Sequence, residues 1–224
     1  MNKYLFPIYA VIIGFIIIKL SKNKPVKNIK LLLAFSGAFL MSMTLFELLP
    51  EVYEHLNARQ TGLFIMLGVL LQIFLEFFSR GAEHGHVHIN KNSTVFPWIL
   101  FVSLCIHAFL EGFPIHQHND MVYGILIHKI PIAILITSYL FESGFKTLQV
   151  GLFLVLFSLM TPLGTLISNN IEGLHGILDY VNAIVIGIFL HISTTILFES
   201  SEGHKFNLGK IIVLVLAVVI AYFI

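Results

Sequence analysis

Two short stretches place ionisable side chains inside long apolar segments. The first is CIHAFLEGFPIH, residues 105–116, and the second is LIHKIPIAIL, residues 126–135. His107 and Glu111 are four residues apart, so on an α-helix both side chains lie along one face. An imidazole and a carboxylate at this spacing can bind one divalent cation together. The second stretch adds His128 as a further nitrogen ligand. Other ionisable residues within apolar segments are Glu47, Glu76, Lys129 and His191.

Helix-breaking residues follow both sets of polar side chains. Gly112 and Pro114 come directly after the first set, and Pro131 follows His128 by three residues. Interrupted membrane helices occur where an ion must reach the backbone. The short turn HQHND makes the two segments antiparallel neighbours, so His107 and His128 are expected at similar depth. Any single buried histidine can instead donate a hydrogen bond to a backbone carbonyl, but three ligand residues beside helix breakers favour a metal site.

The composition is that of a membrane protein. Hydrophobic residues make up 57% of the 224 residues and charged residues 11%, whereas a soluble domain has about 25% charged residues. The alternation typical of barrel strands is absent, so the predicted class is all-α. Eight apolar runs approach the length of about 20 residues that a helix needs to cross a bilayer: 4–20, 31–53, 61–79, 95–115, 121–141, 147–168, 179–198 and 208–224.

Lysine and arginine concentrate on one side of these eight runs. If the N-terminus is outside, ten of the 13 lie in inside loops, and only Lys3 and Arg59 lie in outside loops. Positive residues favour the cytoplasmic side, so both termini are expected outside. The first apolar run lacks a small-residue cleavage site and is expected to stay as a helix. The loops are short, so residues 1–224 are expected to form a single transmembrane domain.

Several functional classes are disfavoured. No basic stripe with interleaved aromatic residues is present, which excludes nucleic acid as a partner. No phosphate-binding loop is present for an ATP-driven pump. Cys105 is the only cysteine, so an internal disulfide is excluded. A metal site in a membrane protein can serve a carrier of metal ions. The main alternative is an intramembrane metal-dependent hydrolase, although the usual His-Glu-x-x-His motif of such enzymes is absent. A metal sensor that binds without transport is a second alternative.

The order of several short motifs resembles the Zrt/Irt-like (ZIP) family of divalent metal transporters. Each motif is weak alone, but together they cover nearly the whole chain in the family's order. They are ELLPE (47–51), EHGHVH (83–88), HAFLEG (107–112), HKIP (128–131), TPLG (161–164) and GIFLHIS (187–193). The resemblance implies an eight-helix bundle in the cell membrane that carries zinc, and also iron or manganese, into the cytoplasm.

The resemblance also implies which residues bind the ion. The transport-site ligands would be His107, Glu111 and His128, with Glu47 and Met43 as secondary candidates. The histidine-rich loop would bind the ion on the cytoplasmic side; its members are His84, His86 and His88. No enzyme activity is expected, and no cofactor apart from the transported ion. The expected partners are a divalent ion, the lipid bilayer and, in a homodimer, a second copy of the chain.

The sequence departs from the family pattern at several positions, including Ile196, where some members have an acid in the seventh helix. Many members bind a second metal next to the first, but the positions of its ligands hold Ala108 and Ile132 here, and Lys129 stands where some members have an acid. A lysine ammonium can take the place and the charge of the second cation, which predicts a site for one metal. His191 stands where the seventh helix usually has tyrosine.

Overall fold

A computed structural model describes residues 3–23, 26, 28–79, 96–115, 120–170, 177–199 and 208–224. All the regular elements in these residues are helices, which confirms the predicted all-α class. The loop histidines His84, His86 and His88 lie outside the described residues. The elements are η1 (Lys3–Leu5), α1 (Phe6–Leu20), α2 (Ile29–Met43), η2 (Thr44–Leu48), α3 (Leu49–His55), α4 (Ala58–Ser79), α5 (Trp98–Leu110), α6 (Met121–Glu142), α7 (Thr147–Asn170), α8 (Leu178–Glu199) and α9 (Leu208–Tyr222).

The described helices form eight rods, because α2, η2 and α3 join into one helix from Ile29 to His55. Five rods are long and apolar enough to cross a membrane: the joined helix, α4, α6, α7 and α8. The other three, α1, α5 and α9, are apolar but only 13 to 15 residues long. The rods match the eight apolar runs, and the main difference is α5, which ends at Leu110 although the run continues to residue 115.

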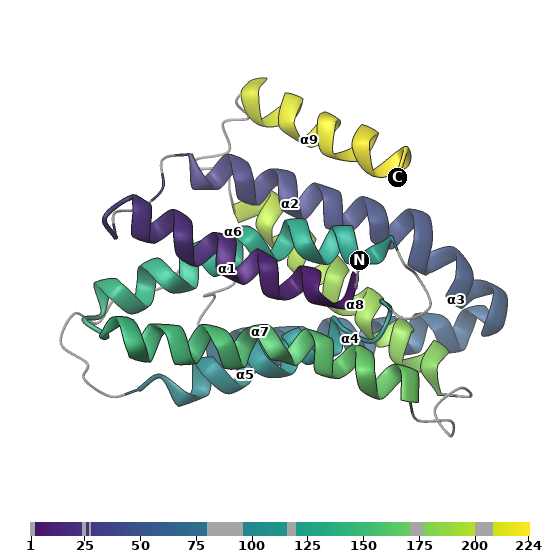
Figure 1. The fold of residues 1–224 in the computed structure, drawn as a ribbon. Helices are drawn as coiled ribbons and strands as arrows, with labels where there is room; N and C mark the ends of the chain where they lie inside the picture. Colours follow the sequence, from purple (N-terminus) through teal and green to yellow (C-terminus); the bar gives the residue numbers. More distant parts are fainter. Residues whose placement is uncertain are drawn as a thin grey trace.

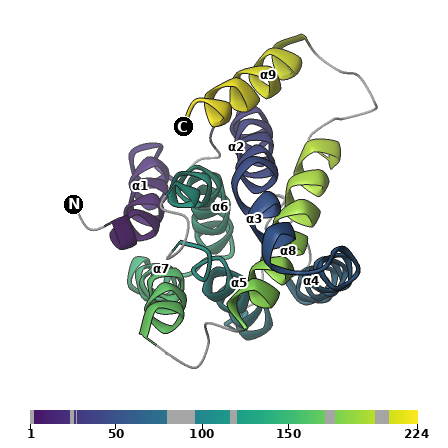
Figure 2. The same ribbon diagram turned by 90° about the vertical axis from the view of Figure 1, so that its right-hand side faces the viewer.

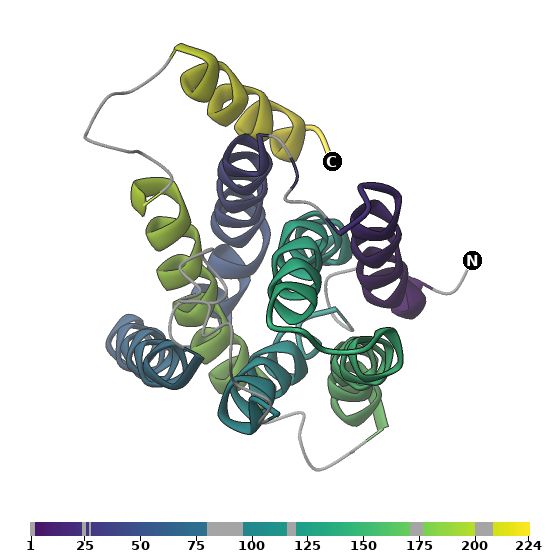
Figure 3. The same ribbon diagram turned by 90° about the vertical axis from the view of Figure 1, so that its left-hand side faces the viewer.

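The rods lie lengthwise in one bundle (Figure 1). Views along the bundle show α2, α6 and α8 in its middle (Figures 2 and 3). Outer helices pair with these inner ones: α1 packs against α6, α9 against α2, and α4 against α8. The helices α5 and α7 pack together beside α6 and supply the rest of the environment of the polar residues.

The pair α4 and α8 runs in the same direction along the bundle. The Phe64 ring lies 4.7 Å from the Tyr180 ring near the start of both helices. One turn further along, a Cβ on Gly68 would collide with the carbonyl oxygen of Ile184. Small residues allow membrane helices to approach closely, so Gly68 sets the short distance between these two backbones.

Two buried apolar clusters fill the bundle, and α6 contributes to both. The first cluster lies among α2, α8, α9 and the N-terminal half of α6, up to Ile125. The second lies among α1, α5, α7 and the C-terminal half of α6, from Ile132 onward. His128 and Lys129 fall between these two stretches of α6. The polar side chains therefore lie where the two apolar clusters meet.

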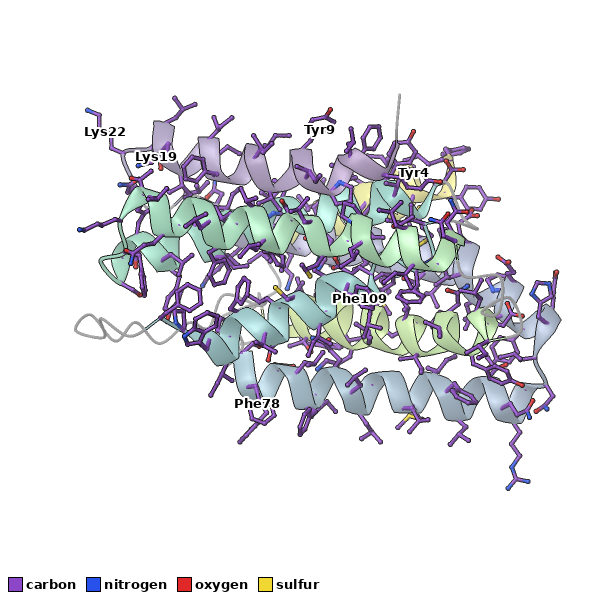
Figure 4. The ribbon with its side chains drawn as sticks, turned by 60° about the horizontal axis from the view of Figure 1, so that its bottom comes forward. Tyr4, Tyr9, Lys19, Lys22, Phe78 and Phe109 are labelled. Carbon is purple, nitrogen blue, oxygen red and sulfur yellow. The ribbon has the colours of Figure 1, made fainter. Side chains whose placement is uncertain are left out.

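Large apolar side chains also cover the outer surface of the bundle, as Figure 4 shows. On α4, the exposed side chains include Leu70, Phe74 and Phe77, and on α9 they include Val215 and Val219. Soluble monomers rarely expose apolar surface on this scale. The outer surface is therefore suited to contact with lipid.

Candidate metal centre

The helix α5 ends at Leu110, directly before Glu111, which carries the central carboxylate. The N–H of Glu111 donates to the carbonyl of His107 at 3.0 Å, but the N–H groups of Gly112 and Phe113 donate to carbonyls only three residues back. Pro114 stops the helix, because proline has no N–H and disfavours a helical conformation in the preceding residue. Both predicted ligands of this segment therefore project from the last turn of α5.

Hydroxyl groups of α7 donate to the backbone carbonyls that the end of α5 leaves without helical donors. Thr161 donates to the carbonyl of Ala108 at 2.8 Å, and Thr165 donates to that of Gly112 at 2.8 Å. Ser168 makes the same kind of bond one turn further along. A buried carbonyl without a donor costs about 1–3 kcal/mol. These bonds therefore hold the last turn of α5 against α7.

The contact between α5 and α7 also explains the motif TPLG. A Cβ on Gly164 would collide with the carbonyl oxygen of Phe109, and a Cβ on Gly112 would collide with that of Thr161. The motif thus supplies a hydroxyl donor and a close approach. From the sequence, TPLG indicated only a resemblance to a family. The available signal was the spacing of Thr161 and Thr165, which places both hydroxyls on one helix face.

The helix α6 presents His128 and Lys129 from its central part. Pro131 lies inside this 22-residue helix without ending it. Proline has no N–H, so the carbonyl of Ile127 lacks its helical donor, but the rod continues on both sides. His128 and Lys129 are each 1% exposed. The expected irregularity beside His128 is therefore a missing hydrogen bond rather than a break.

Three side chains of metal-ligand type meet between α5 and α6. The Nε2 atom of His107 lies 2.8 Å from Oε1 of Glu111, and Nε2 of His128 lies 4.0 Å from the same oxygen. One ligand atom from each residue lies within 4.8 Å of the other two, and all three residues are buried. Within the described ranges this is the only such group of three or more histidine, cysteine and acidic residues. The structure thus brings together the three residues that the spacing singled out.

These separations suit a tetrahedral cation. With metal–ligand distances of about 2.0–2.1 Å, the ligand atoms around a tetrahedral zinc ion lie about 3.3 Å apart. The two separations from Oε1 of Glu111, 2.8 and 4.0 Å, fall on either side of that value. Small side-chain shifts would therefore admit an ion. Two imidazoles and one carboxylate leave one of four positions open, which is typical of sites that exchange a ligand.

Lys129 contacts the other oxygen of the same carboxylate. Its Nζ atom lies 2.5 Å from Oε2 of Glu111. The ammonium also lies 4.9 Å from the centre of the Phe157 ring. The opposite charges of Lys129 and Glu111 compensate each other, and pairing lowers the cost of burying a charge. This pairing allows an ionised carboxylate to remain beside the histidines.

No family model matches the chain, but it is similar over part of its length to proteins of known name. Zinc transporter ZIP1 of Danio rerio is 32% identical over 88 residues, which cover 37% of this chain and 29% of that protein. Zinc transporter ZIP1 of Takifugu rubripes is 28% identical over 95 residues, 40% of this chain and 32% of that protein. Protein zntD of Dictyostelium discoideum is 26% identical over 150 residues, 57% of this chain and 22% of that protein. These distant similarities support the resemblance of the chain to the ZIP family.

The five long apolar helices, together with the similarity to these transporters, are those of a multi-pass membrane protein. The chain spans less than a third of the length of these three relatives. Two of them are named as zinc transporters.

The two secondary ligand candidates lie in different environments. Met43 is fully buried at the end of α2, and its Cβ and Cγ lie 3.5 Å from the point that a Cβ on Gly124 would occupy. Gly124 is one turn before His128, so Met43 lies beside α6 near the three ligands. Glu47 lies in the π-helical turn η2, and its side chain is exposed. The structure therefore does not bring Glu47 into the group of three ligands.

A second histidine–carboxylate pair lies between α4 and α8. The Nε2 atom of His191 lies 2.7 Å from Oε2 of Glu76. These side chains are 18% and 24% exposed. Both residues were candidates from the sequence, but their pairing was not predicted, because they lie 115 positions apart. The pair supplies two ligand atoms, one fewer than the group between α5 and α6.

Proposed function

We propose that this chain is a carrier that moves divalent metal ions, zinc above all, across a membrane into the cytoplasm. The observation that carries this proposal is the buried group of His107, Glu111 and His128, with ligand atoms within 4.8 Å of one another. The names of the two ZIP1 relatives support zinc as the cargo. Iron(II) and manganese are further candidates, because affinity order alone does not select among divalent metals at such a site.

Ion binding begins from side chains that already lie close together. The incoming ion takes the place of the contact between His107 and Glu111 and draws His128 closer. Metal ligands must be deprotonated, so any proton on these imidazoles leaves as the ion binds. The fourth position is taken by water, and Met43 or Glu47 reaches the ion in another state of the transport cycle.

Release follows from the small number of protein ligands. A closed cage of four protein ligands is typical of structural zinc. A transport site must bind well enough to load and weakly enough to unload. Three protein ligands and one exchangeable position meet both needs, and Lys129 stands where many relatives would place a second metal. The site therefore holds one ion at a time.

The orientation of the carrier rests on its basic residues. We propose eight membrane crossings in one domain of residues 1–224, with both termini outside the cell membrane. Lys19 and Lys22 lie at the same end of the bundle as Phe78 near the end of α4 (Figure 4), so this end faces the cytoplasm by the positive-inside rule. The chain after α4 contains His84, His86 and His88, which would receive the ion there. A homodimer remains a prediction from the sequence.

The group of His107, Glu111 and His128 fits a metal-dependent hydrolase less well than a carrier. Such an enzyme needs a carboxylate or another base that can take a proton from the metal-bound water. Glu111 is the only carboxylate in the group. Its oxygens contact His107 and Lys129, which leaves it poorly placed as a base.

The test is zinc uptake into proteoliposomes by the parent chain and by His107→Ala and His128→Ala. Each substitution should lower uptake more than about tenfold, because the loss of one of three protein ligands costs well over about 1.4 kcal/mol. His55→Ala is the matched control, since His55 is a histidine with a 49% exposed side chain outside the group. If both site variants take up zinc as the parent does, His107 and His128 are not ligands of the transported ion. Lipid or peptide turnover without ion flux would favour the hydrolase.

A further inference from the structure

Lys129 makes the two oxygens of Glu111 unequal. Oε1 lies 2.8 Å from His107 and 4.0 Å from His128, whereas Oε2 lies 2.5 Å from the ammonium of Lys129. We propose that Lys129 reserves one oxygen of Glu111 and so limits the site to a cation that accepts few ligands, held by one carboxylate oxygen and two imidazoles. This inference rests on the proposed transport function and names the class of ion that the site takes.

The contact between Lys129 and Glu111 is of a strong kind. A hydrogen bond between an ammonium and a carboxylate is shorter and about twice as strong as one between neutral groups. Both side chains are at most 2% exposed, so water does not compete for them at the surface. An ion that reaches both histidines therefore meets Oε1, while Oε2 keeps its bond to Lys129.

The helix α7 holds this arrangement from one side. Phe157 presents its ring to the ammonium at 4.9 Å, a distance at which a cation and an aromatic ring attract each other. One turn later, Thr161 donates its hydroxyl to the last turn of α5. The same stretch of α7 thus contacts both Lys129 and the segment that carries Glu111. Lys129 is 1% exposed and belongs to the largest fully buried side chains, so it has little room to swing away.

The reserved oxygen disfavours cations that need many oxygen ligands. Calcium takes six to eight oxygens, often with carboxylates bound through both atoms, and magnesium demands six in octahedral geometry. Manganese also prefers oxygen-rich octahedral sites. Zinc accepts four ligands with mixed nitrogen and oxygen donors. With Oε2 bonded to Lys129, the group offers two nitrogens and one oxygen, which suits zinc best.

The positive charge of Lys129 also weakens the binding of the metal ion. With neutral imidazoles, the ammonium and the carboxylate cancel, so the empty site has no net charge and the bound ion is repelled by a cation nearby. Without Lys129, the site would carry one negative charge and offer both oxygens of Glu111. A neutral residue at position 129 should therefore bind zinc more tightly and release it more slowly.

The experiment measures zinc affinity by titration calorimetry on the purified full-length chain and uptake in proteoliposomes. Lys129→Met should lower the zinc Kd at least about tenfold, lower both the KM and the maximal rate of uptake, and strengthen competition by Mn²⁺. Lys129→Arg should instead raise the zinc Kd. A guanidinium group can bind both oxygens of a carboxylate, so it would also cover Oε1. Lys210→Met is the matched control, since Lys210 is a lysine 5% exposed that donates to the Leu197 carbonyl between α9 and α8.

The outcomes separate this inference from the proposed function. If the parent neither binds nor carries zinc, the proposed function fails. If the parent carries zinc but Lys129→Met binds it as the parent does or more weakly, only the inference fails. The same is true if Lys129→Arg keeps the parental affinity, since that result assigns Lys129 a role of charge alone. Lys129→Gln is a second neutral variant with the same expected result, and it replaces Lys129→Met if that variant does not fold.

Discussion

Two histidine–carboxylate contacts of nearly equal length lie inside the bundle, in different surroundings. His107 and Glu111 are 2.8 Å apart, and His191 and Glu76 are 2.7 Å apart. The first contact is at most 4% exposed and is joined by His128. The second is 18–24% exposed, and in the part of the chain that the structure describes it joins no group of three ligands. The contact itself therefore does not distinguish a metal centre from a hydrogen-bonded pair.

The backbone around the two contacts explains the difference. Glu111 ends α5, so the chain turns there and the neighbouring helices α6 and α7 approach the same point. Glu76 and His191 lie within α4 and α8, which both continue beyond the contact. Two continuous helices that lie side by side bring together one side chain from each. A helix that ends between two neighbouring helices allows side chains from all three to meet. We therefore expect the first contact to bind the ion and the second to join two helices.

Removal of one negative charge from each contact should give the largest difference between them. Glu111→Gln keeps the shape of the side chain but removes the only anionic ligand, so zinc uptake in proteoliposomes should fall at least about 100-fold. Glu76→Gln keeps a hydrogen-bond acceptor for His191 and should lower uptake less than about threefold. Equal losses in two well-folded variants would mean that both contacts take part in transport.

Much of the fold follows from the sequence, because the length of an apolar run decides whether a helix can cross lipid. The runs indicated eight rods, and the described residues form eight, of which five are long enough by themselves to cross a membrane. The spacing of His107 and Glu111, together with the short turn before His128, also predicted the group of three. These predictions depend on local periodicity and on residues that are close in the chain, and both can be read directly from the sequence.

Other parts of the site depend on how distant helices are rotated against one another. The bond from Thr161 to Ala108 joins positions 53 residues apart, and nothing local indicates it. Lys129 follows His128, but only the rotation of α6 decides that its ammonium reaches Glu111. Glu47 was a secondary ligand candidate from resemblance alone, and the structure leaves its side chain exposed. Its role as a ligand remains a prediction.

Removal of the Thr161 hydroxyl should have an intermediate effect on zinc affinity. This hydroxyl acts on the contact between His107 and Glu111 only through the backbone of α5. Thr161→Val keeps the size of the side chain and leaves the carbonyl of Ala108 without this donor, next to His107. We expect zinc affinity per folded molecule to fall about three- to tenfold, the equivalent of about 0.7–1.4 kcal/mol. Thr161→Ser restores the hydroxyl and should restore affinity. Calorimetry and thermal unfolding on the same samples test this, since lower stability with parental affinity would make Thr161 a purely structural residue.

His191→Tyr should have the smallest effect and tests the second contact most sharply. Tyrosine is the residue that the resemblance places at this position, and its hydroxyl can donate to the Glu76 carboxylate as His191 does now. Hydrogen bonds between membrane helices contribute about 0.6 kcal/mol on average, so uptake should stay within about twofold of the parent. His191→Phe removes the donor and should lower the melting temperature of the purified chain, with the zinc Kd unchanged. If His191→Tyr abolished uptake by a folded chain, the imidazole itself would be required, and the α4–α8 pair would have to lie on the ion's route.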